Sequence, residues 1–455
     1  MQKHSSSSDI TAGSLWSNIW HMSWPMFIVM LMHFSIGFID IYVAGFLGPD
    51  IQAAVGYVSQ IYFFVVIAAN AISIGTLVLI SRAVGSKNYS AAADIAKQSL
   101  YFGAATAVVL SIIVCLSADF IISISGIPDH LHVPAADFLT IFGLALAPNY
   151  LLIITGAIFR AGAEMKKVLI TMGIVSLLTA AGDFALVFGF GPIPALGYKG
   201  IAISTAIAFA AGLAVSLIFM HASKKWNQIF SRGIILSREI IKKIIIIGWP
   251  LILLQLTWNS GSIFLYAILS SLGTESVTAL AALTNGLRIE GVVYLPAFAL
   301  NMAASVLIGQ NMGAGNAKRA SELGWKIAFA GMVIITLLSV IIFIFAGQLA
   351  GIVTDNKAVA EETTRYLRIN MLAEPFMAMS LILAGALQGA GDTRSVLLNV
   401  FTGTWIVRLP LAYLLAITAE LGATGAWIAM ITSMTIQSIL MGIRFRRGRW
   451  KHIGF

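Results

Sequence analysis

Long apolar stretches alternate with short polar ones along nearly the whole chain. A helix rises about 1.5 Å per residue, so about 20 mostly apolar residues are enough to cross a bilayer. Twelve stretches meet this length and predict twelve transmembrane helices. Their approximate ranges are 16–45, 53–80, 94–118, 136–160, 167–190, 196–220, 244–271, 277–309, 321–350, 365–388, 395–417 and 421–443. They occupy most of the chain, so no separate soluble domain is expected.

The composition agrees with this pattern. Of the 455 residues, 59% are apolar and 10% are charged, whereas about 25% are charged in an ordinary soluble domain. The composition excludes a soluble enzyme, a nucleic-acid-binding module and a disordered chain. Cys115 is the single cysteine, so no intrachain disulfide can form. The polar residues 1–15 lack the layout of a signal peptide, so the first apolar stretch is expected to remain as a span.

The basic residues are distributed unevenly between the two sides of the predicted membrane. One side receives 22 of the 28 Lys and Arg residues. The other side and the spans hold the rest, which are Lys199, Lys357, Arg365, Arg368, Arg288 and Arg408. Because basic connections stay in the cytoplasm, both termini are predicted to be cytoplasmic, in a multi-pass protein of the cytoplasmic (inner) membrane.

Short motifs recur in the same order in the two halves of the chain. Trp24-Pro25 recurs as Trp249-Pro250, and Leu47-Gly48 recurs as Leu272-Gly273. The chain is therefore predicted to form an all-α polytopic membrane protein of two pseudo-symmetric six-helix lobes with the same orientation. Such repeats place a cavity at the lobe interface, and rocking of the lobes gives alternating access. The predicted divisions are a tail 1–15, an N-lobe 16–220, a basic linker 221–243, a C-lobe 244–443 and a basic tail 444–455.

Two carboxylates lie deep inside predicted N-lobe spans, where ionisable groups are costly. Asp40 lies in the first span and Asp183 in the fifth, at comparable expected depths. Two neighbouring carboxyl groups in an apolar cavity are hard to ionise together, so a proton or Na⁺ can bind there and leave again. The alternative for each is a structural hydrogen bond between helices. The matching C-lobe positions, Leu265 and Ala412, are apolar, which favours a function in cation coupling.

Further polar residues within spans are candidates for a proton relay or for the cavity lining. His33 lies two turns before Asp40 on the same helical face. Pro25 can kink the first span and let it bend when Asp40 is protonated; because Pro250 occupies the matching place, architectural kinking is the alternative. The other candidates are Gln60, Thr179, Thr205, Gln255 and Asn259. For these, as for His33, simple helix packing is the alternative.

Four other charged residues lie in or near C-lobe spans, and we expect most of them to brace that lobe: Arg288, Glu290, Glu374 and Arg408. The sequence contains no phosphate-binding loop, no HExxH motif and no cluster of cysteines and histidines. No cofactor, no catalytic residue and no metal site are therefore expected, apart from Na⁺ at Asp40 and Asp183.

Several motifs together resemble the multidrug and toxic compound extrusion (MATE) family over nearly the whole chain. The motifs are Trp24-Pro25, Phe38–Gly48, Ser81–Gly85, Asn301–Asn316, Gln388–Thr393 and Arg408–Tyr413. The resemblance implies the MATE/MOP-type fold and efflux of amphiphilic, often cationic compounds coupled to inward H⁺ or Na⁺ movement.

The position of the acids distinguishes branches of that family. Asp40 and Asp183 match first-lobe acids that some members use for coupling, whereas the NorM-like branch has acids in the seventh and tenth spans. Here the position in the seventh span is Trp258 or Asn259, and the position in the tenth span lies around Met377, without an acid at either position, which favours the DinF-like branch. Thr179 stands where related sequences often have Asn, which favours H⁺ over Na⁺.

The expected partners are small amphiphilic substrates and the bilayer, without nucleic acid, and the protein is expected to work as a monomer. Three other functions stay open, one of which is a channel that would conduct without the strict coupling expected of two carboxyl groups in the cavity. A lipid-linked-precursor flippase of the same superfamily would need a strongly cationic cavity, yet Arg288 and Arg408 are the only basic residues near the middle of a span. A membrane-embedded enzyme would need a catalytic constellation that the sequence does not show.

Overall fold

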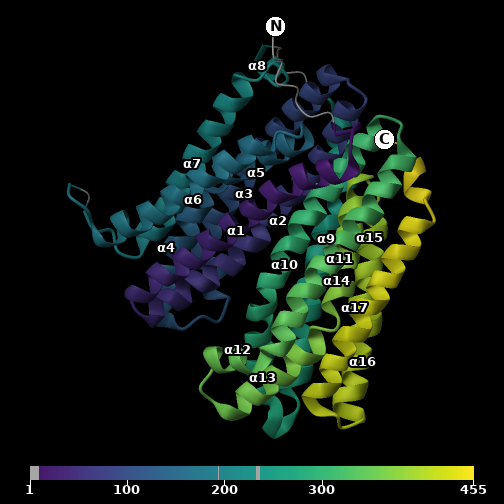
Figure 1. The fold of residues 1–455 in the computed structure, drawn as a ribbon. Coiled ribbons are helices and arrows are strands. Elements are labelled where there is room, and N and C mark those ends of the chain that lie inside the picture. Colours follow the sequence, from purple (N-terminus) through teal and green to yellow (C-terminus); the bar gives the residue numbers. More distant parts are fainter. Residues whose placement is uncertain (1–9, 193, 232–235, 455) are drawn as a thin grey trace. The chain divides into compact units, whose positions relative to one another are not determined.

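A computed structural model describes residues 10–192, 194–231 and 236–454. In these ranges the chain folds into helices joined by short turns, without a β-sheet (Figure 1). Ten helices are long and apolar enough to cross a membrane, and two bent helix pairs raise the number of candidate spans to twelve. The predicted all-α fold with twelve transmembrane helices is therefore confirmed.

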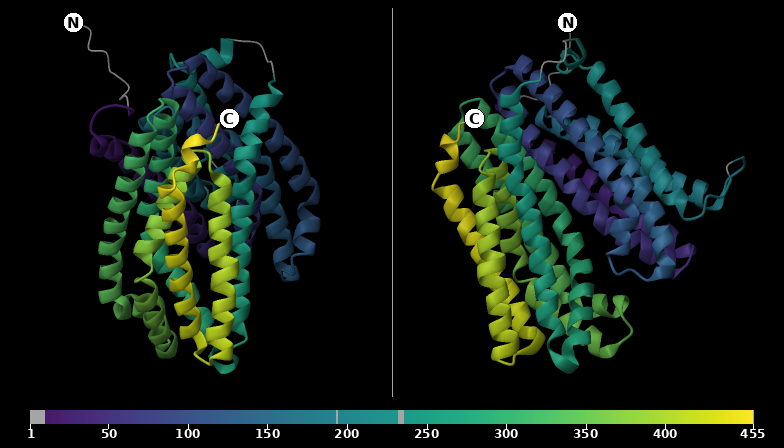
Figure 2. Two further views of the ribbon diagram at one scale, coloured as in Figure 1. Left: turned by 90° about the vertical axis from the view of Figure 1, so that its right-hand side faces the viewer. Right: turned by 180° about the vertical axis from the view of Figure 1, so that it is seen from behind.

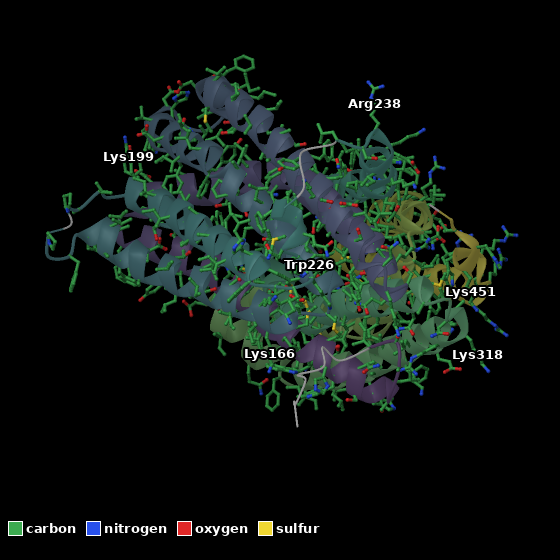
Figure 3. All side chains as sticks on the ribbon, turned by 90° about the horizontal axis from the view of Figure 1, so that it is seen from above. Lys166, Lys199, Trp226, Arg238, Lys318 and Lys451 are labelled. Atoms are coloured by element: carbon green, nitrogen blue, oxygen red, sulfur yellow. The ribbon has the colours of Figure 1, made fainter. Side chains whose placement is uncertain are left out.

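The chain divides into two compact units. Among the described residues, unit 1 comprises 28–248, and unit 2 comprises 10–27 and 249–454. Most helices of the first half belong to unit 1, where α6 packs along α7 and α2 packs along α5. These helices are α1 (Leu15–Phe46), α2 (Pro49–Gly85), α3 (Tyr89–Ser123), α4 (Asp129–Leu144), α5 (Leu146–Ala161), α6 (Met165–Phe188), α7 (Lys199–His221) and α8 (Gln228–Ser231). Lys199 is the first residue of α7, and Trp226 follows its last residue by five positions (Figure 3).

Unit 2 is built around α10 and α14, which pack along each other and against α11. Its long helices lie side by side in all views (Figures 1 and 2). The helices of the second half are α9 (Arg238–Ser270), α10 (Ser276–Gly313), α11 (Ala317–Ile344), α12 (Ala346–Val353), α13 (Lys357–Asn370), α14 (Glu374–Gly389), α15 (Thr393–Phe401), α16 (Leu409–Tyr413) and α17 (Gly422–Arg446). Short helical turns at Gly273–Glu275 and Arg449–His452 complete it.

Prolines explain where the spans bend. The α4–α5 pair bends by 50° and the α13–α14 pair by 56°. Pro148 and Pro375 lie in the first turn after each break, where a proline lacks the N–H and its ring clashes with the carbonyl four residues earlier. The eleventh span instead winds into two π-helical stretches, Thr402–Arg408 and Leu414–Thr418, on either side of α16 and its Pro410.

The first helix of each half crosses between the units. Residues 15–27 of α1 belong to unit 2 and the rest of α1 to unit 1, whereas residues 238–248 of α9 belong to unit 1 and the rest to unit 2. Both crossings lie within three residues of a Trp-Pro pair. The lobe bounds predicted from the sequence put residues 16–27 in the N-lobe and residues 244–248 in the C-lobe. At these two segments the compact units differ from the predicted lobes.

Specific contacts hold each crossing segment in its unit. At the start of α1, Asn18 donates to the main-chain oxygens of Ile10 and Ala12 over 3.0 and 2.8 Å, and Arg319 of α11 donates to Ala12 over 3.0 Å. At the start of α9, a Cβ at Gly248 would lie 2.5 Å from the Ala71 oxygen of α2.

The predicted tails and linker lie partly outside the described residues.

Candidate coupling site

The structure brings Asp40 and Asp183 together inside unit 1. Asp40 lies on the second part of α1 and is half-buried, whereas Asp183 lies on α6 and is fully buried. Their carboxyl groups face each other closely enough to form a hydrogen bond once one of them carries a proton. The sequence indicated only that the two residues lie at comparable depth, and the structure shows that their side chains are in direct contact.

The local packing of α6 against α7 explains how Asp183 is positioned. Gly182 lets α7 approach closely, because a Cβ at this position would collide with the Ser204 hydroxyl. Ser204 lies against the Asp183 carboxylate but donates its hydrogen to the main-chain oxygen of Thr179 over 3.1 Å. The nearest hydroxyl group is thus directed away from the carboxylate.

Several oxygens around this contact have no hydrogen-bond partner among the described residues. They are Asp40 Oδ1, Asp183 Oδ1, Asp183 Oδ2, Thr179 Oγ1 and Thr205 Oγ1. A buried polar atom without a partner costs free energy, and most such atoms in folded proteins are paired. A pair of facing carboxylates is also repulsive, so one added positive charge relieves both costs. The arrangement can hold a proton or a small cation.

The other predicted residues occupy different surroundings. His33 and Gln60 are exposed on α1 and α2, and His33 interacts electrostatically with Arg160 of α5. Thr179 and Thr205 are buried in unit 1. Gln255 and Asn259 lie on α9 within unit 2, where the Asn259 side chain donates to the Gln255 main-chain oxygen over 2.8 Å.

The C-lobe positions that match the two aspartates are filled by apolar packing. Leu265 of α9 and Ala412 of α16 are buried members of one hydrophobic cluster, together with Tyr366 and Trp427. Unit 2 therefore has no counterpart of the Asp40–Asp183 contact at the repeat-related positions. Its buried acids lie elsewhere, at Glu290 of α10, at Glu374 of α14 and at Asp392, which is ion-paired with Arg444.

From the sequence, we expect Arg288 and Glu290 to brace the second lobe. The structure places them on different faces of α10, with Arg288 exposed and Glu290 fully buried. Arg408 does form a bracing contact, because its Nε–H donates to Ser433 Oγ of α17 over 2.8 Å. One feature of the sequence indicates that Glu290 and Glu374 are buried, because each of them lies in or beside an apolar stretch.

Comparison with known proteins identifies the family. The MatE family model matches the chain twice, over residues 25–184 and 250–414. The chain belongs to the MatE family. The two matches begin at Pro25 and Pro250, so the internal repeat found in the sequence is the repeat of this family. MatE-family proteins are transporters, and this chain is a multi-pass membrane transporter with the fold that the resemblance to MATE proteins implied.

Curated MatE relatives span nearly the full length of the chain. The uncharacterized transporter YisQ of Bacillus subtilis is 26% identical, with 95% of this chain and 94% of YisQ covered. The probable multidrug resistance protein NorM of Thermotoga maritima is 25% identical, with 92% of this chain and 90% of NorM covered.

Solved MATE structures share the fold. The crystal structure of MATE in the bent conformation covers 98% of both chains with a TM-score of 0.89 and 20% identity. The outward-facing conformation of a multidrug resistance MATE family transporter of the MOP superfamily covers 98% of both chains with a TM-score of 0.86 and 22% identity.

Proposed function

We propose that the protein is a proton-coupled antiporter that exports amphiphilic, often cationic compounds. The observation that carries the coupling is the contact between Asp40 and Asp183, whose oxygens lack other partners. The class of exported compound is supported by the name of the NorM relative, a probable multidrug resistance protein. No further cofactor is required, because the ion gradient drives the cycle.

A proton suits the site better than Na⁺. Two facing carboxyl groups can share one proton in a hydrogen bond, which removes their repulsion without any further ligand. A bound Na⁺ would need additional oxygens, and the residue one turn before Asp183 is Thr179, whose hydroxyl stands where related sequences often carry an amide. We therefore assign the protein to the DinF-like branch, in agreement with the non-acidic residues Asn259 and Met377, although the tenth span carries Glu374 one turn before Met377.

The path of α1 connects proton binding with movement. Asp40 lies on the part of α1 that belongs to unit 1, while Pro25 lies on the part that belongs to unit 2. Protonation of the pair removes the repulsion between α1 and α6 and so changes how α1 packs in unit 1. For transport to be coupled, the affinity for the substrate and the affinity for the proton must each differ between two states of the transporter. Bending of α1 near Pro25 would link these states in an alternating-access cycle.

The cellular setting follows from the distribution of basic residues. We propose that the protein works as a monomer in the cytoplasmic membrane with both termini in the cytoplasm. Substrate enters from the cytoplasm or the inner leaflet, and protons enter from the outer medium. Accessibility labelling of single cysteines introduced at Asn88 and Asn356, in a Cys115→Ser background, tests this orientation. Labelling of Asn356→Cys and protection of Asn88→Cys in intact cells are expected, and the reverse pattern would refute the orientation.

Transport by purified protein in proteoliposomes tests the coupling. An imposed pH gradient is expected to drive efflux of an amphiphilic cation, and Asp40→Asn and Asp183→Asn are expected to abolish this dependence. Asp119→Asn is the matched control, because Asp119 is an exposed carboxylate of α3. Full pH-driven efflux by Asp40→Asn, or efflux that responds to a Na⁺ gradient alone, contradicts the proposal.

A further inference from the structure

An arginine inside unit 1 has no carboxylate partner among the described residues. Arg160 lies in the last turn of α5, and its half-buried guanidinium donates from Nη2 to the Ser73 hydroxyl of α2 over 3.3 Å. The Nε–H of the same guanidinium is buried without a hydrogen-bond partner in the part of the chain that the structure describes. Because a guanidinium carries five N–H donors and a permanent positive charge, most of its capacity to bind an acceptor is unused.

The side chain of Arg160 runs toward the interior of its span. Basic residues near the end of a span usually extend to the membrane surface, where their charge is solvated. Here Nη1 lies over Gly156, one turn earlier, where an added Cβ would approach it to 3.3 Å. Nη2 reaches Ser73, which lies about 10 Å along the helix from the predicted end of the second span at residue 80. The charge is therefore held in an apolar region, where it is costly.

The internal repeat shows that the scaffold does not require this arginine. Two short motifs flank the position in each half of the chain, Gly156-Ala157 with Ala161-Gly162 and Gly385-Ala386 with Ala390-Gly391. Arg160 therefore corresponds to Gly389. A Cβ at Gly389 would collide with the main chain of Ser305 in α10, so in unit 2 this position serves close helix packing. A role common to both halves does not explain a guanidinium in unit 1.

His33 of α1 adds a third polar side chain to the group. It interacts electrostatically with Arg160, and its side chain is exposed, so the group can be reached from that side of α1. The aspartate pair does not serve as the counter-ion, because Asp40 and Asp183 interact electrostatically with each other rather than with Arg160. Three helices of unit 1 thus bring donors together around an uncompensated positive charge.

The donors define the chemistry of the missing partner. A positive charge in apolar surroundings is stabilised by one negative charge that also accepts hydrogen bonds. The guanidinium fork matches the oxygens of a carboxylate or a phosphate. The Ser73 hydroxyl accepts from Arg160, so its own hydrogen is available to the same acceptor, and the imidazole of His33 supplies another N–H. A cationic compound would be repelled at this position.

We propose that Arg160, together with Ser73 and His33, binds one oxyanion group, a carboxylate or a phosphate, of an amphiphilic molecule. The compounds that this transporter carries then include zwitterionic and anionic amphiphiles as well as cations. Their export rests on the antiport proposed above, whereas binding of the oxyanion does not depend on it. A phospholipid headgroup offers the same phosphate chemistry and is the second source of the group.

Equilibrium binding of dansylglycine to the purified protein tests the site. Dansylglycine is a fluorescent amphiphile with a carboxylate, and dansylglycinamide carries an uncharged amide in its place. In dodecyl maltoside without lipid, the wild type is expected to prefer dansylglycine by at least about tenfold, the ratio that one hydrogen bond to a charged group supplies. Arg160→Gln should abolish this preference, and Arg160→Lys should retain part of it. Lys166→Gln is the matched control, because it removes an exposed positive charge six residues further along (Figure 3).

Gly156→Ala separates binding from folding. Apart from the backbone of its own helix, the added methyl group meets a single atom within 4 Å, which is Arg160 Nη1. The substitution should displace the guanidinium, while the unfolding temperature equals or exceeds that of the wild type because alanine favours a helix. Affinity for dansylglycine should fall at least about threefold, since charge-assisted hydrogen bonds depend on geometry. Gly56→Ala is the control, because a Cβ there meets nothing within 4 Å.

Transport and lipid competition distinguish the two sources of the oxyanion. If a transported molecule supplies it, wild-type proteoliposomes should export dansylglycine, and Arg160→Gln should lower this export without lowering export of an amphiphilic cation. If a lipid supplies it, phosphatidylcholine added to the detergent solution should compete with dansylglycine for the wild type. In that case Arg160→Gln should also purify with less bound phospholipid, which would confirm the site and assign it to a headgroup.

Two results would overturn the site. The wild type could bind dansylglycine and dansylglycinamide with equal affinity, which would show that no oxyanion is recognised. A preference for the carboxylate could also persist unchanged in both Arg160→Gln and Gly156→Ala, which would place recognition elsewhere. These measurements need no ion gradient, so they decide the site even if Asp40→Asn retains pH-driven efflux and the proposed coupling is wrong.

Discussion

The Ser204 hydroxyl lies against the Asp183 carboxylate but donates its hydrogen to the main-chain oxygen of Thr179, over 3.1 Å. This relationship depends on the close approach of α6 and α7 at Gly182. Asp183 therefore keeps both carboxylate oxygens available although a hydroxyl group is adjacent. The contact between the two helices holds the carboxylate in place without neutralising it.

Gly182→Ala is expected to damage transport through this contact. The added methyl group would collide with Ser204 and separate α6 from α7, and overpacking of this kind costs about 1–3 kcal/mol of stability. We expect a lower unfolding temperature in detergent and a loss of pH-driven efflux in proteoliposomes. Because the collision is with the hydroxyl oxygen, the double variant Gly182→Ala/Ser204→Ala should recover part of both. A double variant no better than Gly182→Ala would show that another contact decides the packing.

Thr179→Asn is expected to increase the response to Na⁺. The substitution replaces an unpartnered hydroxyl one turn before Asp183 with an amide oxygen, which can serve as an additional cation ligand next to the two carboxylates. Efflux from proteoliposomes at fixed pH should then be accelerated by an inward Na⁺ gradient, whereas wild-type efflux should not respond. A folded Thr179→Asn protein that ignores Na⁺ would show that the neutral ligand does not select the ion.

Trp226 is expected to anchor the segment that follows α7. Its side chain is 1% exposed, packs against Gly162 and donates from Nε1 to Glu164 over 3.3 Å, while Lys225 donates to the Gly162 oxygen over 3.2 Å (Figure 3). Trp226→Ala should cost about 3–5 kcal/mol if the site cannot collapse. Trypsin cleavage at Lys224 and Lys225 should then become faster than in Trp226→Phe, which retains most of the ring packing. Equal cleavage rates in the wild type and Trp226→Ala would contradict this role.

The twelve spans and the aspartate pair were predictable from the sequence for physical reasons. A span is a local property, because about 20 apolar residues suffice to cross the bilayer wherever they occur. Asp40 and Asp183 could be placed at one depth by counting along two helices of the same direction. Their mutual contact also needs α1 and α6 to be neighbours, which the depth alone does not specify.

The features that depend on packing between distant segments could not be predicted. In the sequence, Glu290 and Glu374 are isolated acids among apolar residues. No local sequence pattern indicates that Tyr366 and Arg408 lie near them. The change of unit within α1 and α9 has the same origin. A continuous apolar helix gives no sign that its first part, anchored by contacts such as Asn18 to Ile10, packs with the other half of the chain.

The crossing points at the two Trp-Pro pairs lead to the last prediction. Pro25 and Pro250 lie inside continuous helices, where a proline leaves the carbonyl four residues earlier without its helical partner and lowers the stiffness of the helix. Each crossing helix belongs to both units, so a change in the arrangement of the units must be accommodated within it. A helix bonded continuously through the crossing would resist that change.

Pro25→Ala is therefore expected to slow transport without removing the proton site. Restoring the backbone hydrogen bond should lower the efflux rate about tenfold, which corresponds to about 1.4 kcal/mol in the barrier. Protonation of the Asp40–Asp183 pair, measured by infrared spectroscopy, should remain as in the wild type. Pro250→Ala should act in the same direction, whereas Pro134→Ala is the control because Pro134 lies inside α4 within a single unit. Wild-type efflux by Pro25→Ala would contradict a hinge in α1, and equal slowing by Pro134→Ala would show that the effect is not specific to the crossings.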